Sequence, residues 1–140
     1  MDSRSWVLLA VPVLVLWGAW GFFARQAASS LGWKTAWLVQ AGAEFCVYAI
    51  AFGVLRPPLT GSPGKGLLFA TLAGVCGPLG SALFYIAITR AKTASVVVPL
   101  TALYPVVTIA LLFLVLNERV SLTKGIGIAL AIAAGLLLSL

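Results

Sequence analysis

The chain has 140 residues, of which 62% are hydrophobic and only 9% are charged, and its formal net charge is +6. A composition this apolar cannot be covered by a water-facing surface, which excludes a soluble globular domain and makes the lipid bilayer the expected solvent. The nine basic residues stand singly or in twos between apolar runs and form no patch, so the positive charge does not indicate nucleic-acid binding.

Five apolar runs follow one another along the chain, each close to the roughly 20 residues that a helix needs to cross a bilayer. They cover about residues 6–24, 36–55, 66–89, 94–116 and 122–140. Transmembrane strands are about half this length and alternate apolar with polar residues, which these runs do not. We therefore predict an all-α membrane protein, a bundle of five transmembrane helices that forms a single domain over residues 1–140.

The first run carries two aromatic residues, Trp17 and Trp20, inside the span. Trp33 and Trp37 fall instead where the aromatic belt at the membrane surface is expected. Inner aromatic faces can bind an organic cation or stack on an amphipathic ligand, which makes Trp17 and Trp20 candidate substrate-binding residues. They can equally well fill core volume or face lipid, and both interpretations stay open.

The second run contains Glu44 near its middle, and this is the only acidic residue inside any of the five runs. An ionisable side chain is costly there, so it is by default a candidate functional residue. Gln40 and Tyr48 lie one turn before and after it, on the same helix face. We expect this face to look into the bundle, where Glu44 could exchange a proton or hold a cationic substrate. The alternative is that Glu44 only forms hydrogen bonds that fix helix packing.

The third and fourth runs combine polar side chains with prolines. Ser81 and Tyr85 lie one turn apart, and Thr101 and Thr108 lie two turns apart, which predicts a polar interior. We count Tyr85, Thr101 and Tyr104 as candidate substrate-binding residues.

Proline removes a helical hydrogen bond and leaves a carbonyl free, and free carbonyls often line transporter sites. The hinge or kink positions predicted on this basis are Gly77, Pro78, Pro99 and Pro105. Kinks that merely improve packing are an equally good explanation.

The fifth run is almost devoid of polar residues and carries small residues at every fourth position, Gly127, Ala131 and Gly135. Such stripes let helices approach closely in a membrane. We predict that this run serves packing or dimerisation, and that the first four runs surround the transport pathway.

The basic residues divide almost evenly between the two sides that the runs define. On the side of the N-terminus lie Arg4, Arg56, Lys65, Arg119 and Lys124, and opposite them lie Arg25, Lys34, Arg90 and Lys92. Because Lys and Arg mark cytoplasmic loops, this gives at most a weak preference for a cytoplasmic N-terminus. The same balance also permits insertion in both orientations and pairing as an antiparallel homodimer, which is the interpretation we favour.

Several kinds of chemistry are not expected. Cys46 and Cys76 both fall inside apolar runs, and the chain has no histidine, the commonest metal ligand and general base. We find no phosphate-binding loop and no nucleophile elbow. The sequence therefore predicts no enzyme activity, no metal and no cofactor.

Three stretches are distinctive: Ser95 to Val106 with Leu116 to Ser121, the glycine-rich residues 125–140, and Trp17 to Phe22 with residues 24–28. Together they resemble the EamA domain of the drug/metabolite transporter superfamily. The resemblance implies transport of small metabolites or drugs across a cell membrane, in bacteria the inner membrane. Members usually carry two such domains, so a single one implies pairing with itself or with a similar five-helix subunit.

The related small multidrug-resistance proteins rely on a glutamate in their first helix, where this chain has no acid, so the resemblance alone does not assign that role to Glu44. Fusion of two five-helix units would invert the second and give an inverted repeat, and an unfused unit needs dual insertion to reach the same arrangement.

Two other functions stay open: a heterodimer subunit of a flippase for lipid-linked precursors, and a scaffold or regulatory subunit that transports nothing.

Overall fold

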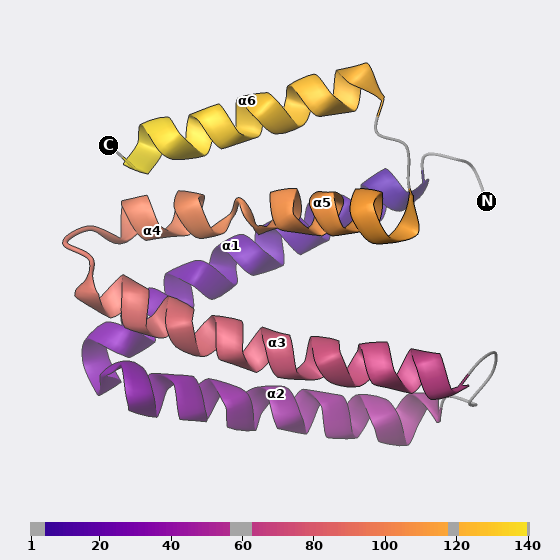
Figure 1. Ribbon diagram of the computed structural model, residues 1–140. Coiled ribbons are helices and arrows are strands. Elements are labelled where there is room, and N and C mark those ends of the chain that lie inside the picture. Colours follow the sequence, from indigo (N-terminus) through magenta and orange to yellow (C-terminus); the bar gives the residue numbers. More distant parts are fainter. Residues whose placement is uncertain (1–4, 57–62, 118–120, 140) are drawn as a thin grey trace. The chain divides into compact units, whose positions relative to one another are not determined.

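The computed structural model describes residues 5–56, 63–117 and 121–139, and the regular elements in these ranges are all α-helices (Figure 1). In chain order the helices are α1 (Ser5–Leu31), α2 (Trp33–Leu55), α3 (Pro63–Arg90), α4 (Ala94–Thr101), α5 (Tyr104–Leu116) and α6 (Leu122–Ser139). The predicted all-α class is confirmed. The chain divides into two compact units, unit 1 up to Thr89 and unit 2 from Arg90 onward, and each is described by itself.

Four described stretches are long and apolar enough to cross a bilayer. They are Leu8–Leu31 in α1, Trp33–Leu55 in α2, Gly64–Arg90 in α3 and Ser95–Val115 over α4 and α5. The fifth predicted run is also helical, but its described apolar stretch is the shorter Gly125–Leu137 within the 18-residue α6. The positions of four of the five predicted spans thus agree with membrane-length apolar stretches.

The first helix is longer than predicted, because it continues from the expected end at Ala24 to Leu31. Ser29 and Ser30 each donate a side-chain hydrogen bond to the carbonyl of Gln26, at 2.8 and 3.0 Å, so these polar residues are accommodated within the helix. The turn to α2 consists of Gly32 alone, whose φ of 75° lies in the left-handed region that favours glycine. The predicted gap between the first two spans, residues 25–35, is therefore helical except for Gly32.

Unit 1 is held together near this turn. Gly21, Ala24 and Ala28 form a buried face of small residues on α1, and Ala36 is buried at the start of α2. Small side chains let the two helices approach closely. Figure 1 shows that α2 and α3 run side by side, whereas α1 leaves them toward its N-terminal end.

The prolines behave differently in the two units. In unit 1, α3 continues through Gly77 and Pro78 as one helix. In unit 2, the fourth predicted run is two helices, since α4 ends at Thr101 and α5 begins at Tyr104. Proline lacks an N–H and crowds the preceding turn, and the break lies between Pro99 and Pro105.

The break in unit 2 is a hydrogen-bonded turn over Ala102 and Leu103. The Ala102 N–H donates to the Val98 carbonyl at 2.9 Å, and the Leu103 N–H donates to the Leu100 carbonyl at 3.2 Å. Leu103 in turn contacts Gly135 of α6, which is buried and packs beside α4. The Glu118–Arg119 pair that forms part of the family resemblance lies outside the described residues.

Candidate functional site

Three of the predicted site residues, Gln40, Glu44 and Tyr85, form a continuous hydrogen-bonded cluster in unit 1. The Gln40 Nε2 donates to Glu44 Oε1 at 2.7 Å, and the Tyr85 hydroxyl donates to Gln40 Oε1, also at 2.7 Å. Gln40 and Glu44 lie one turn apart on α2, and Tyr85 reaches them from α3. Gln40 thus links the carboxylate of one helix to the phenol of another.

The three residues of this cluster are buried to different degrees. Tyr85 is only 2% exposed, whereas Gln40 and Glu44 are half-buried. A buried amide or hydroxyl without a partner is costly, and here the amide oxygen and nitrogen of Gln40 both have partners. Glu44 therefore lies at the margin of the packed part of unit 1, with its carboxylate held on one side by Gln40.

A second polar link between α2 and α3 lies beside the cluster. The Trp37 Nε1 donates to Ser81 Oγ at 3.0 Å, and the Ser81 hydroxyl donates to the Pro78 carbonyl at 2.9 Å. Sequence reasoning assigned Trp37 to the membrane surface and missed this contact. The signal was present, because Trp37, Gln40 and Glu44 are spaced i, i+3, i+7 and share one helix face.

Aromatic rings connect the cluster to α1. The Trp20 and Phe84 ring centroids are 4.9 Å apart, and the Phe84 and Tyr85 rings meet edge to face at 6.5 Å. Both geometries are favourable for aromatic pairs. Phe84 was not predicted, yet it is the residue through which the predicted Trp20 reaches Tyr85.

One cation also joins two helices of unit 1. The Arg25 Nη1 donates to the Ile88 carbonyl at 2.6 Å, Arg25 is half-buried and Ile88 is fully buried. A positive charge is favourable near a helix C-terminus, where carbonyls lack helical partners, and Ile88 lies close to the end of α3. The sequence reasoning used Arg25 only as a topology signal.

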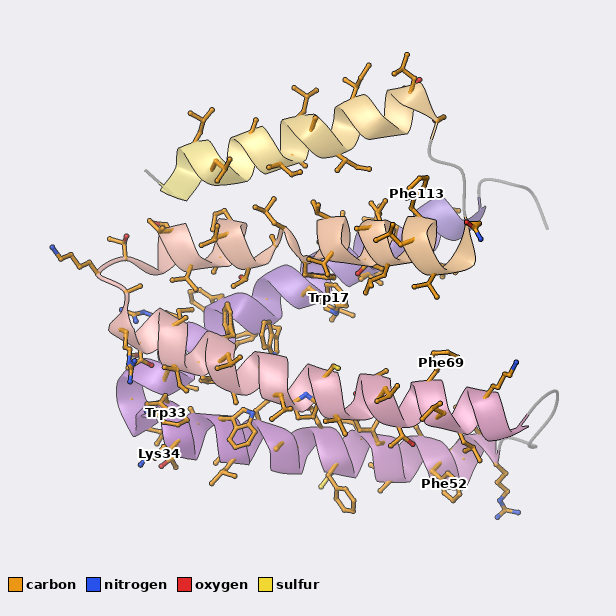
Figure 2. The ribbon with its side chains drawn as sticks, in the orientation of Figure 1. Trp17, Trp33, Lys34, Phe52, Phe69 and Phe113 are labelled. Atoms are coloured by element: carbon orange, nitrogen blue, oxygen red, sulfur yellow. The ribbon has the colours of Figure 1, made fainter. Side chains whose placement is uncertain are left out.

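The ends of α2 fit a membrane-spanning position. Figure 2 shows Trp33 and Lys34 at one end of α2 and Phe52 near the other. The Lys34 Nζ lies 5.8 Å from the centre of the Trp33 ring. Tryptophan and lysine are typical of the membrane surface, so the Glu44 cluster lies in the interior of the span.

Other predicted site residues are not in the cluster. Tyr48 is 69% exposed on α2, and Trp17 is exposed on α1 (Figure 2). In unit 2, Thr101 donates to the Val97 and Val98 carbonyls of its own helix, and Tyr104 is half-exposed. These four side chains are therefore not brought to Glu44 by contacts within unit 1.

The small-residue stripe of α6 is used at one position within unit 2. A Cβ added at Gly135 would lie 2.7 Å from Leu103 Cδ1, whereas one added at Gly127 would meet nothing within 4 Å. Ala131 is exposed. Gly135 therefore packs inside unit 2, and its role and those of Gly127 and Ala131 in dimerisation stay predictions.

Metal-binding groups do not gather in the part of the chain that the structure describes, where no three Cys, Asp or Glu side chains come together. Cys46 and Cys76 are free thiols on exposed positions.

The long apolar helices and the acid within one of them define an α-helical multi-pass membrane protein. The EamA-like transporter family model matches residues 4–140. The chain belongs to this family, whose members are membrane transporters.

One similar protein is an uncharacterized protein of Methanocaldococcus jannaschii, 42% identical over 76 residues. The match covers 54% of this chain and 55% of the relative, so it spans about half the length of each. No solved structure matches the chain.

Proposed function

We propose that the protein moves a small metabolite or an organic cation by alternating access, with Glu44 as the residue that binds the cation or couples transport to an ion. The observation that carries this proposal is the position of Glu44, the central residue of α2 (Trp33–Leu55), half-buried and bonded to Gln40. We propose no catalytic role for Glu44.

The depth of Glu44 supports a transport role. At a rise of about 1.5 Å per residue, it lies roughly 17 Å along the helix axis from either end of α2, which is about half the thickness of a bilayer. A carboxylate at this depth is costly, and such residues mark ion and substrate pathways. Trp20 is half-buried against Phe84 and adds an aromatic face near the cluster, which suits an organic cation.

We also propose that two copies pair as an antiparallel homodimer in the cell membrane, the inner membrane in a bacterium. The nearly equal numbers of basic residues on the two sides support insertion in both orientations. Tyr48 shares the helix face of Glu44 and is exposed, so a second copy can reach this face. In such a pair the two Glu44 side chains are related by an axis in the membrane plane.

The test of Glu44 uses protein reconstituted in liposomes, with tetraphenylphosphonium as the organic cation and uptake measured over a range of pH. Glu44→Gln keeps the size and the hydrogen bond acceptor but removes the charge. We therefore expect uptake to be lost, and any residual uptake to be independent of pH. Glu44→Asp keeps the charge and should retain part of the activity. Wild-type uptake with unchanged pH dependence in Glu44→Gln would refute the assignment.

The two other functions predict different outcomes in the same liposomes. A heterodimer subunit of a lipid-linked-precursor flippase would be inactive alone and active with its partner subunit. A scaffold or regulatory subunit would give no flux with any partner.

A further inference from the structure

We propose that Arg25 is a gating residue, which holds α1 against α3 at one end of unit 1, and that the charge of Glu44 controls this contact through Gln40 and Tyr85. This inference rests on the proposed function, because it assigns to Glu44 the binding of a proton or a cation. Arg25 contacts a backbone carbonyl and not the substrate, so its role is to position helices.

Packing within unit 1 is confined to one end. The buried side chains among its described residues all lie near the α1–α2 turn or the end of α3, and they are Ala24, Ala28, Ala36, Phe84, Tyr85 and Ile88. Residues 11–18 of α1, 45–50 of α2 and 64–80 of α3 are exposed throughout. Unit 1 is therefore closed at the Arg25 end, and Glu44 lies at the border between the packed and the exposed parts.

A continuous chain of contacts runs from Glu44 to Arg25. Glu44 accepts from Gln40, and Gln40 accepts from Tyr85. Tyr85 and Ile88 belong to the same turn of α3, and the Ile88 carbonyl accepts from Arg25. The C-terminal part of α3 is thus tied to α2 at Tyr85 and to α1 at Ile88.

Phe84 strengthens the connection to α1. Its side chain faces Trp20 at 4.9 Å, while the next side chain, Tyr85, reaches Gln40 on α2. Adjacent residues of α3 therefore contact the two other helices of unit 1. A shift of this segment relative to α2 must be accommodated at α1 as well.

The charge of Glu44 decides how firmly this segment is held. An ionised carboxylate only accepts hydrogen bonds, and a bond to it is roughly twice as strong as one between neutral groups. It therefore fixes Gln40 with its nitrogen toward Glu44 and its oxygen toward Tyr85. When Glu44 takes up a proton or pairs with a cation, Gln40 is held less firmly, and Tyr85 loses an oriented acceptor.

When the gate opens, Arg25 can exchange its contact with Ile88 for other hydrogen-bond acceptors. Arg25 has five N–H donors, and the structure assigns one of them to the Ile88 carbonyl. When α1 and α3 separate, water or lipid headgroups can replace that carbonyl, since Arg25 is half-exposed near the end of α1.

Other groups that titrate or carry charge need to be considered in a pH experiment. Tyr85 is the titratable side chain that α3 brings to Gln40 and Glu44, and Arg25 is the charged side chain that α1 brings to the same end of unit 1. On α2 itself the remaining groups are Lys34, Cys46, Tyr48 and Arg56. Glu44 is the acid of α2, so a response that Glu44→Gln abolishes reports on its carboxyl group.

The experiment measures the distance between α1 and α3 at this end in reconstituted protein. Spin labels are attached at Phe23 and Leu83, which are 65% and 68% exposed, in a Cys46→Ser, Cys76→Ser background. An excess of unlabelled subunits isolates the distance within one chain and makes the readout independent of orientation in the membrane. We expect short distances at high pH and a second, longer population at low pH.

Four variants connect that response to the chain of contacts. Glu44→Gln should show the longer population at every pH, and Gln40→Leu should lose the pH response although Glu44 is intact. Arg25→Gln should shift the ratio of the two populations by about tenfold toward the longer one at high pH, as expected for the loss of a hydrogen bond from a charged group. Arg25→Lys retains a donor and should fall between Arg25→Gln and wild type.

A matched control and two outcomes make the test decisive. Trp37→Phe removes the other polar link between α2 and α3 and should leave the pH response intact. If the distances in wild type are the same at all pH values, or if Gln40→Leu responds like wild type, the gating proposal is wrong. The proposed function is judged separately, by whether Glu44→Gln loses uptake of tetraphenylphosphonium.

Discussion

At the scale of single residues, Tyr85 combines burial with a hydrogen bond to the Glu44 cluster. It is 2% exposed, its hydroxyl donates to Gln40, and its ring meets that of Phe84. A buried aromatic ring contributes through its apolar area, and its hydroxyl contributes only if it has a partner. The two contributions can be separated by substitution.

Tyr85→Phe removes the hydroxyl and keeps the ring, so we expect a loss of about 1 kcal/mol in the free energy of unfolding. Tyr85→Ala also removes the ring and should cost about 3 kcal/mol or more. Unfolding in mixed detergent and sodium dodecyl sulfate measures both. Tyr48→Phe is the matched control, since Tyr48 is 69% exposed, and equal losses for Tyr48→Phe and Tyr85→Phe would argue against the Gln40 contact.

Helical spacing was sufficient to predict that Gln40 and Glu44 share a face, and that Tyr85 is a polar residue of the interior. It could not show that Tyr85 meets Gln40, because spacing within one helix says nothing about the rotation of its neighbour. Arg25 and Phe84 were missed for the same reason. Their partners, the Ile88 carbonyl and the Trp20 ring, are more than sixty residues away in sequence.

At the scale of helices, apolar run length predicted the existence of the helices well and their ends less well. α1 passes through Arg25 and Gln26 because both are good helix formers, whereas run length counts polar residues as the end of a span. Pro99 and Pro105 indicated a break in this run, but its position at Ala102 and Leu103 depends on local hydrogen bonds.

The packing of α6 in unit 2 gives a prediction at this scale. Gly135→Leu places a large side chain against Leu103, where even a Cβ would lie 2.7 Å from Cδ1, and should cost about 1–3 kcal/mol of unfolding free energy. Gly127→Leu meets open space within the single chain and should change the stability of the monomer by less than about 0.5 kcal/mol. Thermal unfolding in detergent compares the two, and similar losses would mean that Leu103 does not pack on Gly135.

At the scale of the whole molecule, the near balance of basic residues predicts that one or two added positive charges determine the orientation of the chain in the membrane. Thr35→Lys adds a charge on the side of Arg25 and Lys34, and Thr123→Lys adds one on the opposite side. Because basic residues favour the cytoplasm, each variant should insert mainly in one orientation, opposite to the other.

Because each of these variants inserts mainly in one orientation, an antiparallel dimer requires one copy of each. Each should transport poorly alone, and co-expression should restore uptake, with orientation measured by labelling of single cysteines near the termini in intact cells. Full activity of both variants alone, or a single orientation of the wild-type chain, would contradict dual insertion.

The most direct test of the central claim, that Glu44 binds the transported cation or the coupling proton, is proton release on binding. Tetraphenylphosphonium is added to the purified protein in a weakly buffered solution, and the protons released per bound cation are measured. If the cation displaces a proton from Glu44, wild-type protein should release protons on binding, and Glu44→Gln should release none. Equal release by wild type and Glu44→Gln would contradict the claim.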